Sequence, residues 1–306
     1  AQSGTLYKKF SPFEARKQRA VLVTRNIAAY IEDRYLSKPK DWRPLVYCWR
    51  GGKRSGAFAH ILREIGWDAH RLEGGYKAWR HQLVHDLTVL PVKFRFLVVS
   101  GPTGSAKSRV LEVLASLGAQ VLHLEALAAH KGSVLGGLPD EAQPSQKGFE
   151  TRLHQALSRL DPTRPVFVEA ESRRIGKVQV PEALIAAIRG AACMNVRASL
   201  PARVEFLLRD YAYALADPEW ILGRLELLRG LHSNETIAGW REMTVSGRFP
   251  ELVGALLERH YDPLYQRSQT GQFRNHDQAL VFATDDLSAA GIERLAASML
   301  SACGSP

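Results

Sequence analysis

The spacing of apolar residues divides the first ninety residues into short helices and strands. In the helix predicted from Ser55, apolar residues at positions 58, 61, 62 and 65 share one face, and Gly66 is a stop signal. Further helices are predicted at 25–35 and 76–83. Strands are predicted at 45–47, which looks buried, and at 68–72. Residues 87–93, which contain Pro91, are the predicted linker.

A second run of alternating elements begins with the apolar strand 96–100. A Gly-rich turn and a helix to about Leu117 follow it, and further strands are predicted at 121–124 and 165–168. Residues 132–145, rich in Gly and Pro, are predicted as a long loop, and the chain after Ala202 is predicted to be helical. The alternation predicts an α/β fold with two parallel sheets. The predicted domains are 1–90 and 94–200, with a helical region at 201–306 packed on the second.

Charge is the unusual feature of the composition. The 306 residues include 41 Lys and Arg against 31 Asp and Glu, a formal net charge of +10. This excess favours a polyanionic partner such as nucleic acid, because neutralised phosphates release counterions; a solvated basic surface is the alternative. No apolar run approaches the ~20 residues of a membrane helix. Three cysteines without a Cys-x-x-Cys pair predict free thiols in a reducing cytoplasm.

A nucleophilic cysteine is predicted between the strand 45–47 and the helix after it. The loop there consists of Cys48, Trp49, Arg50, Gly51, Gly52, Lys53, Arg54 and Ser55. Backbone N–H groups of such a loop converge on its centre, and the helix N-terminus and three basic side chains add positive charge. These groups would lower the pKa of the Cys48 thiol and hold an oxyanion such as phosphate, thiosulfate or selenophosphate. A buried, inert thiol is the alternative, and it is the interpretation kept for Cys193 and Cys303.

A phosphate-binding loop is predicted directly after the strand 96–100. Its residues are Gly101, Pro102, Thr103, Gly104, Ser105, Ala106, Lys107 and Ser108. A strand before the loop and a helix after it are the context of a Walker A motif. The backbone N–H groups would cradle phosphates, Lys107 would neutralise them, and Ser108 would ligate Mg²⁺. Ala106 replaces the usual Gly before the lysine, which would weaken binding if the position needs positive φ.

Acidic residues at predicted strand ends are candidates for a base or for holding a Mg²⁺-bound water. Glu169 and Glu171 follow the strand 165–168 and share one face by period-two alternation, and Glu125, after the strand 121–124, is a weaker candidate. The alternative is that these acids face solvent, paired with neighbouring arginines. Basic residues that are candidate contacts to RNA or phosphate, or else a solvated face, are Lys131, Arg173, Arg174, Arg197 and Arg203.

The two loops and their order resemble a known family. The loop 48–55, followed by the Glu-Gly-Gly-Tyr stretch at 73–76 and Trp79, resembles the rhodanese sulfurtransferase domain. With the phosphate loop and the stretches 124–125, 130–133, 168–173 and 261–265, most of the chain resembles the bacterial tRNA 2-selenouridine synthases. The resemblance implies a rhodanese-like α/β domain, then a P-loop α/β domain with a helical C-terminal extension. It also implies an N-terminally truncated rhodanese domain, because no strand with an Asp-x-Arg motif precedes Cys48.

The resemblance implies a transferase that modifies the wobble position of tRNA. Members of the family replace the sulfur of 2-thiouridine with selenium from selenophosphate, after a geranyl group from geranyl diphosphate has been attached to that sulfur. Cys48 would be the essential rhodanese cysteine, and Lys107 with Ser108 would grip the donor diphosphate or a tRNA phosphate. No tightly bound cofactor is implied, with Mg²⁺ as the one possible metal. Apolar residues that could line a geranyl pocket, although they are more often core, are Phe206, Leu207, Tyr211 and Tyr213.

Three other functions fit parts of the sequence. A small-molecule kinase or NTPase with an accessory rhodanese module predicts nucleotide turnover without tRNA. A non-catalytic RNA-binding scaffold predicts that replacing Cys48 leaves any tRNA modification intact. A phosphatase is the third alternative, because five residues separate Cys48 from Arg54, as in the Cys-x5-Arg-Ser pattern of tyrosine phosphatases, although no general acid can be identified by spacing.

Overall fold

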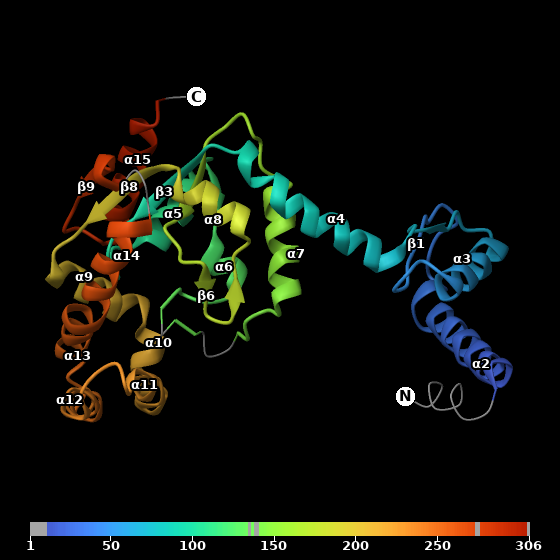
Figure 1. Cartoon of the computed structure of the whole chain (residues 1–306), viewed down its shortest axis with the longest axis horizontal. Coiled ribbons are helices and arrows are strands. Elements are labelled where there is room, and N and C mark those ends of the chain that lie inside the picture. Colours follow the sequence, from blue (N-terminus) through green and yellow to red (C-terminus); the bar gives the residue numbers. More distant parts are fainter. Residues whose placement is uncertain (1–10, 134–135, 138–140, 273–275, 305–306) are drawn as a thin grey trace. The chain divides into compact units, whose positions relative to one another are not determined.

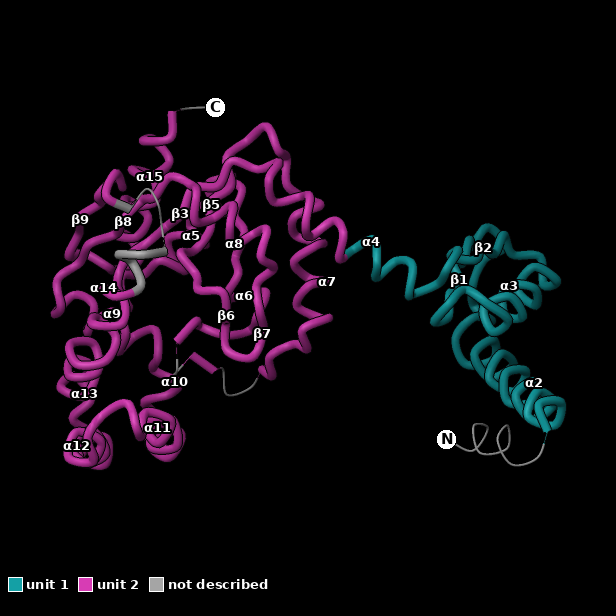
Figure 2. The backbone as a smooth tube through the Cα atoms, viewed as in Figure 1, with its two compact units in different colours: residues 1–83 teal, residues 84–306 magenta. Residues whose placement is uncertain are grey.

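The chain divides into two compact units (Figures 1 and 2), residues 1–83 and residues 84–306. The computed structural model describes residues 11–133, 136–137, 141–272 and 276–304. The division falls inside α4 (Gly75–Val89), a single helix that extends into the residues predicted as a linker. The helix persists there because Leu87 is buried, and it gives way to a 3-10 turn at Pro91–Lys93, where proline cannot continue it. Residues 94–200 and 201–306 belong to one unit.

Unit 1 is built around a short pair of parallel strands. The strands β1 (Leu45–Val46) and β2 (His70–Arg71) pair in register, and α3 (Lys53–Ile65) connects them. Its core consists of Val46, Ala59, Leu62, Trp67 and Ala69. Leu45 and Tyr47 are exposed, so the prediction of a buried strand at 45–47 is correct for its central residue alone. Gly66 ends α3 in the left-handed conformation, as its position in the sequence predicts.

The helix predicted at 25–35 starts much earlier than residue 25. α2 spans Pro12–Tyr30 and passes into a π-helical turn at Ile31–Tyr35. Ser11 caps α2 by accepting a hydrogen bond from the Phe13 N–H, and Pro12 occupies the first helical position. The start signal is therefore present in the sequence, but only Ala15 and Ile27 of α2 are buried, so its apolar periodicity is weak.

Unit 2 contains a parallel five-stranded sheet in the order β4-β5-β3-β8-β9. The strands are β3 (Phe96–Ser100), β4 (Gln120–Leu122), β5 (Val166–Glu169), β8 (Ala192–Arg197) and β9 (Leu280–Ala283). α5 (Lys107–Ser116) and α15 (Ala289–Ala302) pack on the face to which Leu97 and Val99 point, and α8 (Glu182–Arg189) packs against β3 (Figure 1). The prediction of β3 is confirmed at both ends, and the α/β class with parallel sheets is confirmed.

The C-terminal region adds helices beside the sheet and one strand within it. β9 lies in the segment predicted to be entirely helical, so that prediction is wrong at this point. β9 is an edge strand of four residues with Leu280 and Val281 half exposed, and so it lacks the apolar pattern of a buried strand. The other helices are α6 (Leu124–Ala128), α7 (Gln146–Leu157), α9 (Leu200–Asp210), α10 (Ala212–Leu215), α11 (Pro218–Leu225), α12 (Asn234–Val245), α13 (Phe249–Leu256) and α14 (Asp262–Gln272).

Shorter elements complete unit 2. They are the antiparallel pair β6 (Arg174–Ile175) and β7 (Val178–Gln179), the 3-10 turns Glu226–Leu228 and His276–Gln278, and the π-helical turn Leu257–Tyr261. Helices α11, α12 and α13 enclose a second apolar cluster that includes Leu225 and Trp240. Within the described ranges, none of the helices has both the length and the apolar character required to cross a bilayer.

Candidate functional site

The Cys48 loop is clamped between two helices of unit 1. It leads into the N-terminus of α3, and its carbonyl oxygens also accept hydrogen bonds from the first turn of α4: Tyr76 N–H donates to Cys48 O and Lys77 N–H to Trp49 O, both at 2.9 Å. These bonds satisfy N–H groups that a helix start leaves free. Gly75 permits the close approach, because it has φ +60° and a Cβ there would lie 2.1 Å from Cys48 O.

The loop turns Cys48 into an acidic thiol. Partial burial acts to raise the pKa, but hydrogen bonds from the Ser55 hydroxyl and from the backbone N–H groups of Ser55, Arg50 and Gly52 outweigh it and lower the pKa of Cys48 to about 6. The Ser55 Oγ lies 3.2 Å from the sulfur. The geometry therefore agrees with the predicted thiolate. By contrast, burial raises the pKa of both Cys193 and Cys303.

The phosphate loop in unit 2 has the backbone shape that the motif predicts. Gly104 has φ +85°, and Ala106 has φ +60° directly before α5, so the position usually held by Gly does need left-handed backbone. The Lys107 ammonium donates to the carbonyl oxygens of Gly101 (2.9 Å) and Pro102 (3.1 Å) at the centre of the loop. Burial lowers the pKa of Lys107, and the nearby glutamates oppose this.

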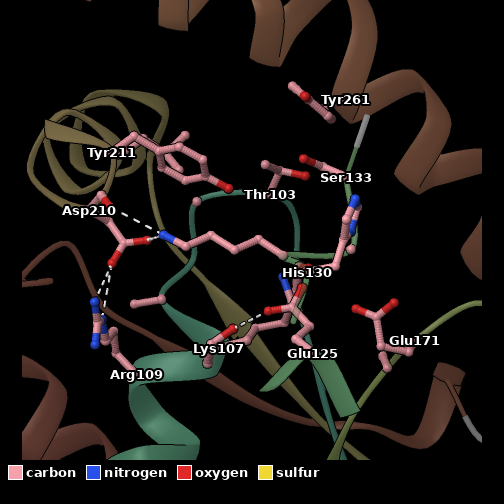
Figure 3. A pocket seen from close by; sticks show the side chains of 18 of the residues that line it. Thr103, Lys107, Arg109, Glu125, His130, Ser133, Glu171, Asp210, Tyr211 and Tyr261 are labelled. Carbon is pink, nitrogen blue, oxygen red and sulfur yellow. Dashed lines mark hydrogen bonds and ion pairs between the residues drawn. The ribbon is translucent and has the colours of Figure 1, made fainter. Parts of the chain in front are cut away.

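Two carboxylates face the phosphate loop across a narrow gap. These are Glu125 and Glu171 (Figure 3). Ser108 Oγ donates to Glu125 at 2.8 Å, and a Cβ built on Gly132 would lie within 2.8 Å of both carboxylates. Burial, followed by the charge of Glu169, raises the pKa of Glu125; burial and then Glu125 raise the pKa of Glu171 well above its usual range. Crowded, half-buried carboxylates of this kind are suited to holding a proton or a cation.

The opposite wall of the cavity comes from the end of α9. The Lys131 ammonium lies 2.5 Å from a carboxylate oxygen of Asp210 and 4.1 Å from the ring centre of Tyr211. Arg109 binds the same carboxylate at 2.9 Å (Figure 3). Although burial acts to raise the pKa of Asp210, its two basic partners lower it. Together the walls line an open cavity of about 720 Å³ that carries many charged side chains, and we call it the phosphate cavity.

A second, apolar cavity adjoins the phosphate cavity. It has a volume of about 80 Å³ and lies between α9, α11 and α13. The residues that line both cavities are Thr103, Ser133, Leu207, Tyr211 and Tyr261. Those that line the apolar cavity alone include Ala214, Trp220, Leu252 and Leu256. Of the residues proposed for a geranyl pocket, Leu207 and Tyr211 thus lie at the junction, Phe206 lines the phosphate cavity, and Tyr213 stacks on Tyr211.

Several predicted site residues have other positions. Glu169 is buried at the end of β5, where it accepts a hydrogen bond from the Leu124 N–H and pairs with His123; burial opposes but does not prevent a raised pKa of His123. Arg203 is buried and makes a two-pronged ion pair with Asp262, both bonds at 2.8 Å, while also donating to Thr103 O. Arg203 therefore links the phosphate loop to Asp262 at the start of α14 and does not point into solvent.

The remaining basic candidates are exposed. Arg173 forms an ion pair with Glu182, Arg174 donates to the backbone oxygen of Gly176, and Arg197 ends β8. Residues that were not singled out from the sequence are Asp210, Arg109 and His123, all of which line the phosphate cavity. His130 and Lys131 belong to the stretch 130–133 that resembles the family, and both line the phosphate cavity. Gly132 in the same stretch lies next to Glu125 and Glu171.

Comparison with known families matches both units. Residues 94–222 match the family model described as the tRNA 2-selenouridine synthase AAA domain, and residues 18–82 match the rhodanese-like domain. Among curated relatives, the tRNA 2-selenouridine synthase of Aeromonas salmonicida is 31% identical over 294 residues, which cover 87% of this chain and 78% of that protein. The synthase of Bdellovibrio bacteriovorus is 33% identical over 221 residues, or 69% of this chain and 56% of that protein.

The extent of the match differs among relatives. The synthase of Nitrosomonas europaea is 38% identical over 172 residues, which make up 55% of this chain and 44% of that protein. The chain therefore spans about half the length of several curated relatives that it matches.

Proposed function

The chain belongs to the tRNA 2-selenouridine synthase family, and on that premise we propose that it modifies 2-thiouridine at the wobble position of tRNA. Unit 2 would attach a geranyl group from geranyl diphosphate to the sulfur. Unit 1 would then support replacement of the S-geranyl group by selenium from selenophosphate. The proposal assigns one loop to each step: the phosphate loop to geranyl transfer and the Cys48 loop to the selenium step.

The observation that carries the proposal is that the phosphate cavity opens onto an apolar cavity. Geranyl diphosphate has a charged head and a hydrocarbon tail. The phosphate cavity carries charged side chains, the adjoining cavity is lined mainly by apolar ones, and the two share Thr103, Leu207 and Tyr211. A nucleotide would instead bring a polar ribose to the junction. Apolar walls stabilise the tail by removing it from water, at roughly 0.8 kcal/mol for each buried CH2 group.

In the geranyl step, the thiouridine sulfur bonds to C1 of the geranyl group as the bond from C1 to the diphosphate oxygen breaks, and the base loses its N3 proton to water. Negative charge then grows on the departing diphosphate. Lys107, whose ammonium lies at the centre of the loop, and the backbone N–H groups of the loop would stabilise that charge. Ser108 and Glu125 supply oxygen ligands of the type that Mg²⁺ prefers, and a bound Mg²⁺ would neutralise part of the diphosphate charge. Among the described residues, no larger group of His, Cys, Asp and Glu side chains is placed to hold a metal ion.

In the selenium step, a C–Se bond forms at C2 of the base as the C–S bond breaks and geranyl thiol leaves with a proton. Water takes the phosphoryl group of selenophosphate, so that the Se–P bond breaks and inorganic phosphate is released. In the Cys48 loop, backbone N–H groups converge on the Cys48 sulfur and favour its thiolate, and this positive environment would also attract selenophosphate. The sulfur is already ionised near neutral pH, so no separate base is needed to activate it.

The test is incubation of the chain with 2-thiouridine tRNA, geranyl diphosphate and selenophosphate, followed by mass spectrometry of the nucleosides. We expect both S-geranyl-2-thiouridine and 2-selenouridine. Lys107→Ala should reduce geranyl transfer about 10- to 150-fold, the loss expected for a charge-assisted hydrogen bond of ~1.5–3 kcal/mol. Lys177→Ala, which changes an exposed lysine in the same unit, is the matched control. Absence of both products would refute the proposal. ATP turnover without tRNA would favour the alternative function of an NTPase.

A further inference from the structure

All of the chain's excess positive charge belongs to unit 1. Residues 1–83 contain 17 Lys and Arg against 7 Asp and Glu, whereas residues 84–306 contain 24 against 24. Unit 1 thus carries the whole net charge of +10, and unit 2 is balanced. Because a basic surface attracts polyanions through counterion release, the electrostatic attraction for a nucleic acid is concentrated on unit 1.

Three aromatic side chains of unit 1 form a row that begins next to Cys48. The ring of Trp49 stacks on Tyr76, with centroids 5.3 Å apart and planes at 27°, and Tyr76 contacts Trp79 at 5.5 Å. Trp49 is 50% exposed and Trp79 is 36% exposed. We call these three residues the aromatic row. Large rings left in water at both ends of a stack offer flat apolar area to a partner.

The backbone fixes this row relative to the thiolate. The hydrogen bonds from α4 to the carbonyl oxygens of Cys48 and Trp49 lock the loop onto the helix that carries Tyr76 and Trp79. The close approach at Gly75 leaves no room for the loop to shift along that helix. The row is therefore preorganised, and binding to it would require little ordering of side chains.

We infer that the aromatic row is a stacking platform for unpaired bases of an RNA loop, holding them beside Cys48. Charge favours RNA over an apolar peptide, because the Cys48 loop, which carries Trp49, also carries the exposed cations Arg50, Lys53 and Arg54. Stacking tolerates any base, and the surrounding cations follow the phosphates. The inference deepens the proposed function, on which it rests: a wobble base lies in an unpaired loop, and it must reach the thiolate.

The experiment compares two hairpin RNAs, one with an intact loop and one whose loop nucleotides are abasic but keep their phosphates. Binding to the full chain is followed by fluorescence anisotropy. We expect the abasic loop to bind about 5- to 150-fold more weakly, the range for loss of one stacked base. Trp49→Ala should weaken binding of the intact loop by a similar factor and should no longer distinguish the two RNAs. Trp49→Phe should restore most of the discrimination.

Two further variants separate stacking from damage to the loop. Trp79→Ala lies outside the Cys48 loop and should also reduce the discrimination, whereas Phe13→Ala, which removes an aromatic ring 63% exposed on α2, should not. Alkylation of Cys48 at neutral pH reports whether each variant keeps its loop. Equal binding of the two RNAs by the unaltered chain would overturn the inference. So would protection of Trp49 from acrylamide quenching in the free protein, because another part of the chain would then cover the row.

The outcomes separate this inference from the proposed function. If tRNA is modified but the two hairpins bind equally, the platform is wrong and the function stands. If the unaltered chain binds the intact loop more tightly than the abasic loop and Trp49→Ala abolishes that difference, but no modified nucleoside forms, the platform stands and the proposed function is wrong.

Discussion

Replacing Ser55 by Ala tests the origin of the Cys48 thiolate. The Ser55 hydroxyl, 3.2 Å from the sulfur, is the largest of the interactions that lower the pKa of Cys48 to about 6. A hydrogen bond to a charged group is worth ~1.5–3 kcal/mol, and partial solvent exposure of the sulfur reduces this to roughly one pKa unit. The variant should therefore have a Cys48 pKa near 7, since the backbone N–H groups that also lower it remain.

The assay is the rate of iodoacetamide alkylation of Cys48 as a function of pH, read by peptide mass spectrometry. At pH 6.5 the thiolate fraction should fall from about three quarters in the unaltered chain to about one quarter in Ser55→Ala. Cys193 and Cys303 are internal references in the same digest, because burial raises their pKa and moves their reaction to higher pH. Ser116→Ala, which changes an exposed serine of α5, should leave the profile unchanged.

A midpoint near 9 in the unaltered chain would refute the reasoning, as would a midpoint that Ser55→Ala does not move. The sign for stability follows from the same pKa. Because the folded chain has the lower Cys48 pKa, ionisation should stabilise unit 1 increasingly as the pH rises from about 6 towards the unfolded value of 9.0, and this contribution is lost as the pH falls through 6.

Further predictions concern the glycine contact, the apolar cavity and the buried ion pair. Gly75→Ala should destabilise unit 1 by more than ~2 kcal/mol in chemical denaturation and raise the thiol pKa, since a Cβ there meets a loop carbonyl oxygen at 2.1 Å. Gly52→Ala, where nothing lies within 4 Å of the Cβ, should be much milder. Ala214→Phe should fill the apolar cavity and raise the KM for geranyl diphosphate, with inorganic diphosphate affinity nearly unchanged in calorimetry. Arg203→Leu should lower the free energy of unfolding of unit 2 by ~3–5 kcal/mol, because it leaves Asp262 without its buried partner; a loss under ~1 kcal/mol would contradict this.

Features set by neighbours in the chain were predictable from the sequence. β3, the Gly66 stop and the start of α5 each follow from a handful of consecutive residues. The need for left-handed backbone at Ala106 was likewise a local consequence of the loop pattern, and the structure has φ +60° there. The two loops at the centre of the proposed function could thus be located before the fold was known.

Features set by distant packing were not predictable. Period-two alternation placed Glu169 and Glu171 on one face, but β5 ends at Glu169, whose carboxylate is taken up by His123 and the Leu124 N–H. β4 stops at Leu122, so Glu125 lies on α6 and reaches Ser108, and is not at a strand end. Which carboxylate faces the cavity depends on where these elements stop, and only the assembled sheet fixes that.

The same holds for the opposite wall of the phosphate cavity. Asp210 comes from α9, a hundred residues after the phosphate loop, and joins it through Arg109 and Lys131. β9 was not predicted because an edge strand can form without a buried apolar pattern in its own sequence. Its backbone hydrogen bonds are made with β8, which is distant in the chain.

The most direct test of the two-site account is nucleoside mass spectrometry of 2-thiouridine tRNA incubated with Cys48→Ser, geranyl diphosphate and selenophosphate. The account assigns Cys48 to the selenium step alone and the phosphate loop to geranyl transfer. It predicts that S-geranyl-2-thiouridine accumulates while 2-selenouridine is absent. Formation of 2-selenouridine at the rate of the unaltered chain, or loss of the geranylated nucleoside in a variant that folds normally, would contradict it.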